Sequence, residues 1–235
     1  MSARLRSRAM LTRMSADATE VRLAAALARL PLFPLPNVVL FPQASLRLHI
    51  FEDRYRAMTR DILSGERFLA MGLIVESASP ADESPAVEPI AGVGEVIMAH
   101  ELPDGRFNLV VRGHTRVHID QELASDRPYR LVSASVLPDL PVSGRDELRD
   151  AEQTLRVLIG QLADAIPEGG EPLRQIVAGL ETPAALANVA AAELIADVSV
   201  RQQLLEIRDV GKRLERVTAE IVSMTARLIA PGVLN

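Results

Sequence analysis

Prolines interrupt an apolar stretch of the chain, residues 30–42, which read LPLFPLPNVVLFP. Proline donates no backbone N–H and fixes its own φ angle, so it breaks helices and is kept out of the middle of sheets. This stretch can therefore be neither a helix nor a central strand. We expect it to run as an apolar chain along the rim of a β-structure.

Two regular elements follow this stretch. Apolar and polar residues alternate in residues 45–51 (SLRLHIF), which is the period of a half-buried strand. Residues 52–63 then change to helical spacing, with Tyr55, Met58 and Ile62 on one stripe. The sequence thus predicts a rim segment, a strand and one amphipathic helix in close succession.

Further strands are predicted up to residue 138. A loop rich in proline and acidic residues occupies residues 76–89, and Pro103-Asp104-Gly105 has the composition of a tight turn. The predicted strands are residues 68–75, 90–102, 106–113, 115–123 and 129–138. Five or six strands with one helix predict a small closed or nearly closed barrel over residues 30–138.

The remainder of the chain has helical patterns. Residues 139–144 have the composition of a linker, and residues 145–235 are predicted to form an α-helical bundle, so the fold class is α+β. Thr182-Pro183 is typical of a helix start, with a cap residue followed by proline in the first turn.

The last helix has the most regular pattern in the chain. Its apolar residues alternate in steps of three and four: Ile207, Val210, Leu214, Val217, Ile221, Met224 and Leu228. Such a seam either joins a coiled-coil partner or packs inside the protein's own bundle. We favour the second reading because the preceding helices also need a partner, and we expect a monomer or a weak dimer.

Residues 1–29 are predicted to be a loose N-terminal extension that ends in a short helix. Residues 1–16 contain four arginines and no acidic residue, which is the composition of an organelle transit peptide. An upstream start codon that adds a tail explains them as well, and we favour that reading.

Composition limits the classes of protein that fit. The chain is 48% hydrophobic and 24% charged, which is typical of a globular protein, and no apolar run reaches the ~18 residues of a membrane span. Cysteine is absent, which excludes disulfides and thiolate chemistry. We expect a cytoplasmic protein that does not associate with a membrane. A net charge of −5 disfavours nucleic acid as a partner.

Several motifs, in this order, resemble the amino-terminal substrate-binding domain of the ATP-dependent Lon proteases. They are Pro31-Leu32-Phe33-Pro34-Leu35, Val38-Val39-Leu40-Phe41-Pro42, Ile50-Phe51-Glu52 with Arg54-Tyr55, VGEV at 93–96, ELPDGR at 101–106, LVVRGHTRVHI at 109–119, RQQLLE at 201–206 and Arg213-Leu214-Glu215. The resemblance covers residues 30–229. It implies a PUA-like barrel and a stand-alone substrate-binding protein that lacks the ATPase and peptidase domains.

The residues themselves argue against catalysis. The one lysine, Lys212, lacks the glycines of a nucleotide-binding loop and should point outward from the last helix, so it can serve neither an ATPase nor a Ser-Lys peptidase. His114 and His118 lie about 13 Å apart if they share a strand, because a strand rises ~3.3 Å per residue. We therefore predict no enzyme activity, no metal and no cofactor.

The predicted function is recognition of unfolded or extended polypeptide segments, with a protease or a chaperone as a further partner. The predicted contact residues are Leu35, Val38, Asp53, Arg56 and Arg60. PUA-like barrels also bind RNA or nucleotides, which is the alternative function, although only 3% of residues are aromatic. A small-molecule pocket between barrel and bundle is a third alternative.

Overall fold

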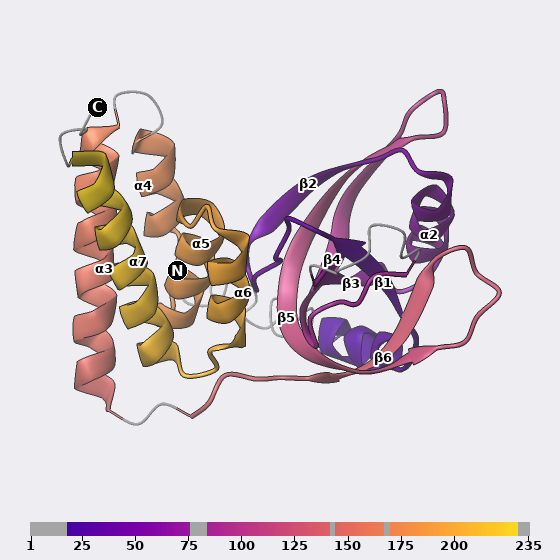
Figure 1. Ribbon diagram of the computed structural model, residues 1–235, viewed down its shortest axis with the longest axis horizontal. Coiled ribbons are helices and arrows are strands. Elements are labelled where there is room, and N and C mark those ends of the chain that lie inside the picture. The colour runs from indigo at the N-terminus through magenta and orange to yellow at the C-terminus, as the bar shows by residue number, and fades with distance from the viewer. Residues whose placement is uncertain (1–17, 76–83, 142–143, 167–169, 230–235) are drawn as a thin grey trace, which may run out of the picture.

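The computed structural model describes residues 18–75, 84–141, 144–166 and 170–229. Figure 1 shows a β-barrel beside a bundle of helices, with a single chain segment running from β6 to the first long helix of the bundle. A helix over residues 18–26 and the 3-10 turn η1 (Leu27–Arg29) pack against the barrel through Leu23, Ala26 and Leu27, which confirms the short helix predicted there. No helix in the described part of the chain is long and apolar enough to cross a membrane.

Six strands form the barrel, where the sequence predicted five or six. They are β1 (Leu30–Leu35), β2 (Ser45–Ile50), β3 (Phe68–Leu73), β4 (Ile90–Glu101), β5 (Phe107–Leu123) and β6 (Arg130–Val136). Their order is β2-β5-β4-β3-β1-β6, and a further pairing of β5 with β6 closes the barrel. β1 and β3 are parallel, and the other pairs are antiparallel. Helix α2 (Asp53–Ser64) buries the predicted stripe of Tyr55, Met58 and Ile62.

β5 is one continuous strand, where the sequence predicted two. Its first half pairs with β2, its second half pairs with β6, and β4 runs along most of its other side. The register shifts between Val93 and Gly94 and between Ile119 and Gln121. Irregularities of this kind bend a strand and increase its twist. A single bent strand can therefore belong to two sides of the barrel.

β1 lies inside the sheet, so the predicted rim position of residues 30–35 is wrong. β1 pairs with β6 only through Leu30–Leu32 and with β3 only through Leu32–Leu35. Pro31 and Pro34 therefore each sit where the strand is paired on one side only. A missing N–H is tolerated there because the other edge of the strand needs no partner.

The backbone of the segment after β1 lies in close contact with the backbone of β4 and β5 in the barrel wall. Its residues Leu40 and Phe41 pass directly over Gly92 of β4 and Gly113 of β5, where an added Cβ would overlap their carbonyl oxygens. Leu40 enters the barrel core, whereas Val39 and Phe41 enter the core of the helical bundle. This crossing segment (Val39–Phe41) thus contributes to both cores.

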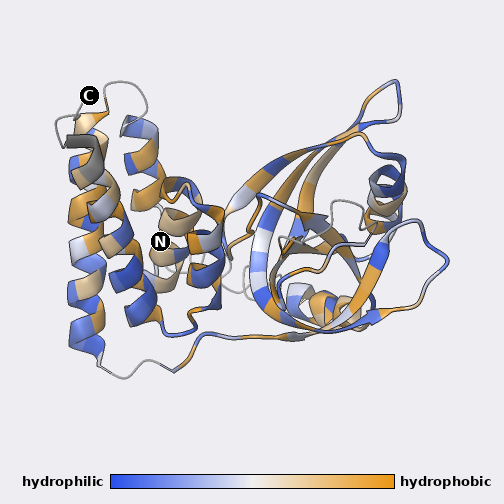
Figure 2. Ribbon diagram, in the orientation of Figure 1, coloured by the Kyte–Doolittle hydropathy of each residue, from blue (hydrophilic) through white to orange (hydrophobic). Residues whose placement is uncertain are grey.

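Five helices form the bundle: α3 (Arg145–Ala165), α4 (Gly170–Ala178), α5 (Pro183–Leu194), α6 (Val198–Glu206) and α7 (Val210–Ile229). α5 starts as predicted, because the Thr182 side chain accepts a hydrogen bond from the Ala185 N–H and Pro183 occupies the first turn. The separate helix α4 was not predicted. Figure 2 shows hydrophobic and hydrophilic residues alternating along α3 and α7, as two-sided helices require.

The seam of α7 packs inside the bundle, which confirms the favoured reading. Leu214, Val217 and Ile221 are fully buried with residues of α3, α5 and α6. α7 begins only at Val210, so Ile207 lies in the connection after α6, and the side chain of Leu228 lies outside the described residues. Lys212 is exposed, as predicted.

Gly113→Ala tests the crossing. We expect it to lower the free energy of unfolding by about 2 kcal/mol, since the new methyl group forces the crossing segment away from β5. Gly160→Ala in α3 is the matched control, because its added methyl group meets no atom within 4 Å and should stabilise the helix by about 0.5–1 kcal/mol. Urea unfolding measures both, and equal effects of the two changes would contradict the crossing.

Leu214→Asp tests the seam. It buries an unpaired charge among apolar side chains and should cost ~3–5 kcal/mol. Lys212→Asp, two residues away on the exposed side, should be nearly neutral. Denaturant unfolding with sedimentation checks the assignment. It fails if both variants behave alike, or if Leu214→Asp converts a dimer into a folded monomer.

Candidate functional site

The barrel has a cleft of about 860 Å³, within the range of ligand-binding sites. Four parts of the chain surround it: the end of β1, the start of α2, residues between β3 and β4, and the connection between β5 and β6. Its lining residues are Pro34, Leu35, Pro36, Glu52, Arg54, Tyr55, Ile74, Ser84, Pro85, Glu122, Leu123, Ala124, Ser125, Arg127, Pro128, Tyr129 and Arg130.

Apolar groups from separate elements meet in this cleft. Leu35 is half-buried and rests on the barrel core beside Tyr55 and Tyr129, which are both buried members of that core. The Phe33 and Tyr55 rings pack with centroids 4.4 Å apart, which holds α2 against β1. The cleft can therefore accept an apolar side chain without rearranging the barrel.

Charged groups of the cleft pair with one another. Arg54 contacts Glu52 at 2.9 Å, and Arg130 donates two hydrogen bonds to Glu122, at 2.9 and 2.7 Å. Arg130 also donates to the carbonyl of Pro85, at 2.8 Å. Because each of these cations has an acid beside it, the cleft carries no concentrated positive charge.

Asp61 of α2 fixes the connection between β5 and β6. Its Oδ2 accepts hydrogen bonds from the Tyr129 hydroxyl and the Arg127 guanidinium, both at 2.6 Å. Burial, followed by the hydrogen bond to Asp61, raises the pKa of Tyr129 to about 12. The phenol therefore stays protonated near neutral pH and acts as a hydrogen-bond donor.

The end of β1 presents an edge without N–H donors to this cleft. Leu35 O accepts from Ile74 N at 3.0 Å, so the backbone of Leu35 faces β3. Successive residues of a strand face opposite sides, so the carbonyl of Pro34 faces away from β3, where β6 no longer pairs with β1. A bound chain can donate to this carbonyl but cannot complete a β-ladder with β1.

The other predicted contact residues lie elsewhere. Arg56 pairs with Asp53 at 2.7 Å and donates to the carbonyls of Gly105 and Asp104, and Arg60 pairs with Glu101 at 3.4 Å. These contacts hold α2 against the β4–β5 hairpin. Val38 is half-buried against the barrel core. The cleft thus brings in only Leu35 of the five, and their role in polypeptide binding stays a prediction.

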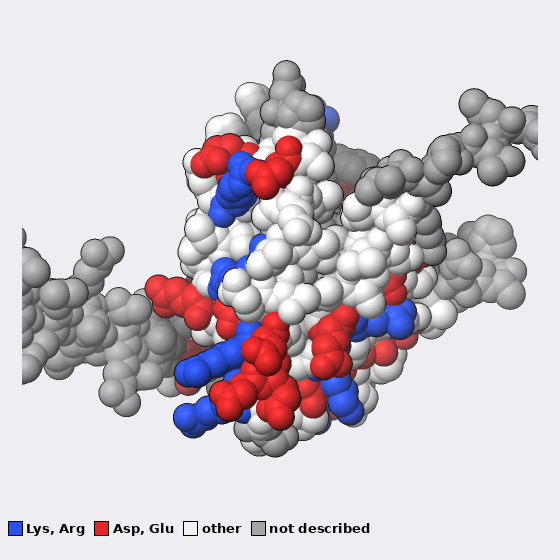
Figure 3. All heavy atoms as spheres, turned by 90° about the vertical axis from the view of Figure 1, so that its left-hand side faces the viewer, with Lys and Arg blue, Asp and Glu red and all other residues white. Residues whose placement is uncertain are grey.

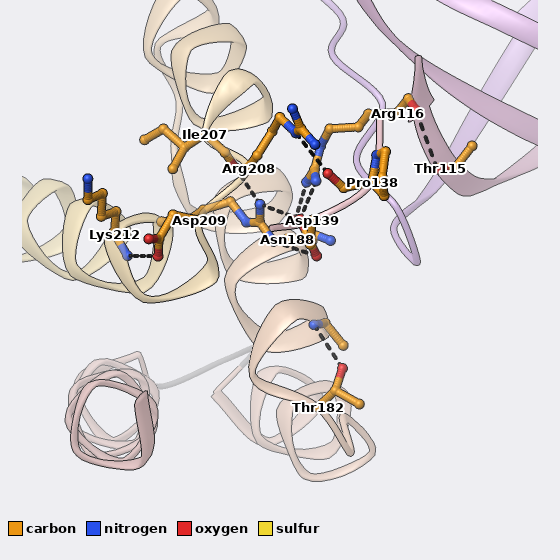
Figure 4. Close-up of polar contacts among 12 residues, drawn as sticks. Thr115, Arg116, Pro138, Asp139, Thr182, Asn188, Ile207, Arg208, Asp209 and Lys212 are labelled. Carbon is orange, nitrogen blue, oxygen red and sulfur yellow. Dashed lines mark hydrogen bonds and ion pairs between the residues drawn. The ribbon is translucent and has the colours of Figure 1, made fainter. Parts of the chain in front are cut away.

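A second charged cluster lies between barrel and bundle (Figure 4). Arg116 of β5 and Arg213 of α7 are 3% and 0% exposed, and both pair with Asp139 of the linker. Arg213 is bidentate, at 3.0 and 3.2 Å, and also donates to the Ile207 carbonyl. Arg116 also donates to Asn188 Oδ1 at 3.4 Å.

These contacts fix Asp139, at the start of the predicted linker, to both halves, and the residues on either side of it make further contacts. Arg208 donates to the Pro138 carbonyl at 2.9 Å, and the Leu140 N–H donates to the Arg208 carbonyl at 3.0 Å. Burial raises the pKa of Asp139, but the hydrogen bonds and charges of Arg213 and Arg116 outweigh it and lower that pKa below its usual value. Burial and the neighbouring Arg213 lower the pKa of Arg116. The cluster joins the three segments.

The junction of barrel and bundle is packed, which argues against the predicted small-molecule pocket. Phe41, Leu73, Leu186 and Leu204 are buried there in one apolar cluster. Gln202 adds a hydrogen bond to the Ile90 carbonyl at 2.9 Å.

The outer side of the bundle carries a shallower groove. It lies between α3 and α7, where Val157 and Val222 are about half exposed. Figure 3 looks onto this side of the molecule and shows a large group of charged side chains low in the view, a smaller group near the top, and uncharged side chains over much of the rest. Nothing in the structure indicates what covers this groove.

The predicted histidine arrangement brings no metal ligands together. His114 and His118 are both exposed on β5, and His118 pairs with Asp120 at 3.1 Å. Among the residues that the structure describes, no group of three or more His, Asp or Glu side chains could hold a metal ion.

Fold and cleft together define an α+β binding domain: a closed barrel with a fused helical bundle. The chain matches the family described as the ATP-dependent protease La (LON) substrate-binding domain over residues 29–223, and it belongs to this family.

Full-length relatives and solved structures agree with this assignment. The chain is 28% identical to a Lon protease of Xanthomonas oryzae over 79% of its own length and 22% of the relative's. It is 27% identical to a Lon protease of Dictyoglomus thermophilum, over 80% and 24% of the two chains. The chain therefore spans less than a quarter of the length of these relatives.

Two solved structures share the fold. The N-terminal domain of a Mycobacterium avium complex Lon protease superposes with a TM-score of 0.67 at 17% identity, over 83% of this chain and 98% of that one. A Lon N-terminal domain protein from Xanthomonas campestris gives 0.56 at 24% identity, over 81% and 97%.

Asp139→Asn tests the buried cluster. It leaves two buried guanidinium groups without their carboxylate and should cost about 3 kcal/mol at pH 7. Because the pKa of Asp139 is lowered in the folded protein, its stabilisation is present above the pKa of an unfolded aspartate and is lost as pH falls through the folded value.

The difference in unfolding free energy between wild type and Asp139→Asn should therefore shrink between pH 6 and pH 3. Urea unfolding across this range measures it. Asp104→Asn, on the exposed β4–β5 hairpin, is the control and should change stability little. A difference that stays constant with pH would show that the carboxylate charge does not stabilise the cluster.

Proposed function

We propose that this protein binds unfolded or extended polypeptide segments through the cleft beside β1 and that it is not an enzyme. The cleft is the observation that carries the proposal: it combines an apolar floor with charges that are already paired. Membership of a substrate-binding family supports a polypeptide as the ligand.

Apolar segments of unfolded chains fit the chemistry of this cleft. Leu35, which is half-buried, gains apolar contact area when a side chain covers it, and burial of apolar area stabilises a complex by about 25 cal/mol per Å². The Pro34 carbonyl can accept one hydrogen bond from the backbone of the bound segment. A folded protein exposes few segments that offer both groups.

The charge arrangement favours a polypeptide over RNA or a nucleotide, which was the alternative. Phosphate recognition relies on cations that are free to contact it. Arg54, Arg127 and Arg130 each pair with an acid of the same protein, Glu52, Asp61 and Glu122 respectively.

We further propose that the protein acts in the cytoplasm as an adaptor or chaperone-like factor that delivers bound segments to a protease or a chaperone. This proposal is supported by the similarity of the chain to one domain of Lon proteases. Its partner surface lies outside the cleft in this proposal, so that a bound segment and the partner are held together.

Ala124→Glu tests the cleft. We expect the wild type to bind fluorescein-labelled, reduced and carboxymethylated α-lactalbumin, which is permanently unfolded, and to ignore the native form. Ala124 is exposed and lines the cleft, so the added carboxylate should weaken binding at least fivefold without disturbing the barrel. Fluorescence anisotropy measures the affinity.

Ala219→Glu is the matched control, since Ala219 is exposed on α7 and far along the chain from the cleft. It should bind like the wild type. Equal weakening by both variants would place binding elsewhere, and no binding of unfolded α-lactalbumin would refute the function. A salt-sensitive shift with RNA in the same assay would favour the alternative.

A further inference from the structure

β2 has an edge that is unpaired along its whole length. β2 is the end strand of the sheet and pairs only with β5, through all six residues and without a register shift. Figure 1 shows β2 at the margin of the barrel, with no strand on its outer side. The unpaired end of β1, by contrast, carries Pro34.

The free backbone groups of this edge can be assigned. The Ala44 carbonyl accepts from the Gly113 N–H of β5 at 2.8 Å, so even-numbered residues of β2 direct their backbone groups to β5. Ser45, Arg47 and His49 therefore direct N–H and C=O groups outward. No other described group is hydrogen-bonded to these backbone atoms.

Exposed edges of this kind are usually protected by proline, an irregularity, an inward-pointing charge or charged side chains along the strand. Along Ser45–Ile50, β2 has only the single charge of Arg47. Its inward side chains are Leu46, Leu48 and Ile50, and its outward side chains Ser45, Arg47 and His49 are exposed. A regular edge of six residues with a single charge can accept a further strand, provided that the strand complements this charge.

The side chains on the two faces of β2 indicate which residues an added strand should contain. Leu46 and Leu48 are only half-buried, so apolar side chains of the added strand would cover them. Arg47 forms no ion pair with an acidic residue in the described part of the chain. Arg106 of the nearby β4–β5 hairpin, by contrast, pairs with Asp104. An acidic side chain on the outward face of the added strand would pair with Arg47.

The geometry points to the open edge of β2 as a docking site for an extended polypeptide in which apolar and acidic residues alternate. This inference rests on the proposed function and adds a second contact to it, in which the backbone of the bound segment continues the barrel sheet. Main-chain hydrogen bonds give affinity in this mode, and the alternate side chains give selectivity.

A second copy of the chain fits this edge less well. Antiparallel pairing of two β2 strands centred on Arg47 would set the two guanidinium groups directly opposite each other. Like charges in such a pair destabilise a sheet. The partner that the charge favours is therefore an acidic segment of another polypeptide.

Amide hydrogen exchange gives the direct test. The probe is a capped eight-residue peptide of alternating valine and glutamate, and the same peptide with lysine in place of glutamate is its control. NMR should show slow exchange at Leu46 and Leu48 in the free protein. Saturation with the glutamate peptide should slow exchange at Arg47 and His49 at least tenfold. The lysine peptide should bind at least tenfold more weakly.

Two substitutions of Arg47 distinguish the contribution of its backbone N–H to peptide binding from that of its side chain. Arg47→Pro removes an outward N–H but leaves the ladder with β5 intact, and Leu46 before it is already extended. We expect at least tenfold weaker binding of the glutamate peptide. Arg47→Ala keeps the N–H and loses only the charge, so about threefold weaker binding is expected. Should Arg47→Pro fail to fold, the exchange pattern of the wild type still decides.

Each result has one meaning. No added protection at Arg47 and His49 overturns the inference, as does equal binding of both peptides. Slow exchange at these amides without peptide, increasing with protein concentration, would show a second copy on the edge instead. If unfolded α-lactalbumin still binds and Ala124→Glu still weakens it, the proposed function stands without the β2 site.

Discussion

One short segment with side chains in two cores sets the architecture of this protein. Val39 and Phe41 point into the bundle, and Leu40 between them points into the barrel. Alternation along an extended chain produces this arrangement directly. It works only because Gly92 and Gly113 leave room for the backbone to lie against the wall. Without this contact, barrel and bundle would be two small domains, and each would expose the apolar surface that the contact now buries.

The contacts around the crossing segment are of different physical kinds. The apolar cluster around Phe41 supplies most of the burial, while the Asp139 cluster places a carboxylate between two guanidinium groups. Buried ion pairs add little net stability but are costly to break. We therefore read the Asp139 cluster as fixing the position of the linker, and the apolar cluster as the main source of adhesion between the halves.

Local patterns in the sequence predicted the elements but not all of their connections. Apolar patterns identified five of the six strands, with β5 in two pieces. The Thr182-Pro183 helix start was confirmed, and the seam of Leu214, Val217 and Ile221 was assigned to the bundle interior. β5 was divided because Gly113 resembles a turn residue, although it is there to admit Phe41. β1 was placed at the rim because proline is normally excluded from the middle of a sheet. Its two prolines fit inside the sheet because β6 and β3 pair with different parts of β1, and the sequence of β1 alone does not show where its neighbours end.

The candidate site was less accessible to such reasoning. Leu35 was predicted, but the cleft also needs Tyr129 and Ala124, which are nearly a hundred residues away and have no distinguishing local pattern. Arg116, Asp139 and Arg213 likewise come from three separate segments. Contacts of this kind follow from the closure of the barrel, which no short window of sequence contains.

The halves of this molecule are attached at more than one place, among them the crossing segment and the linker around Asp139. A single attachment acts as a hinge and permits rotation, whereas two attachments at different positions resist both rotation and separation. Force applied to a polypeptide held by the barrel would therefore be transmitted to the bundle without first extending a slack linker. The protein should respond to pulling as one stiff body.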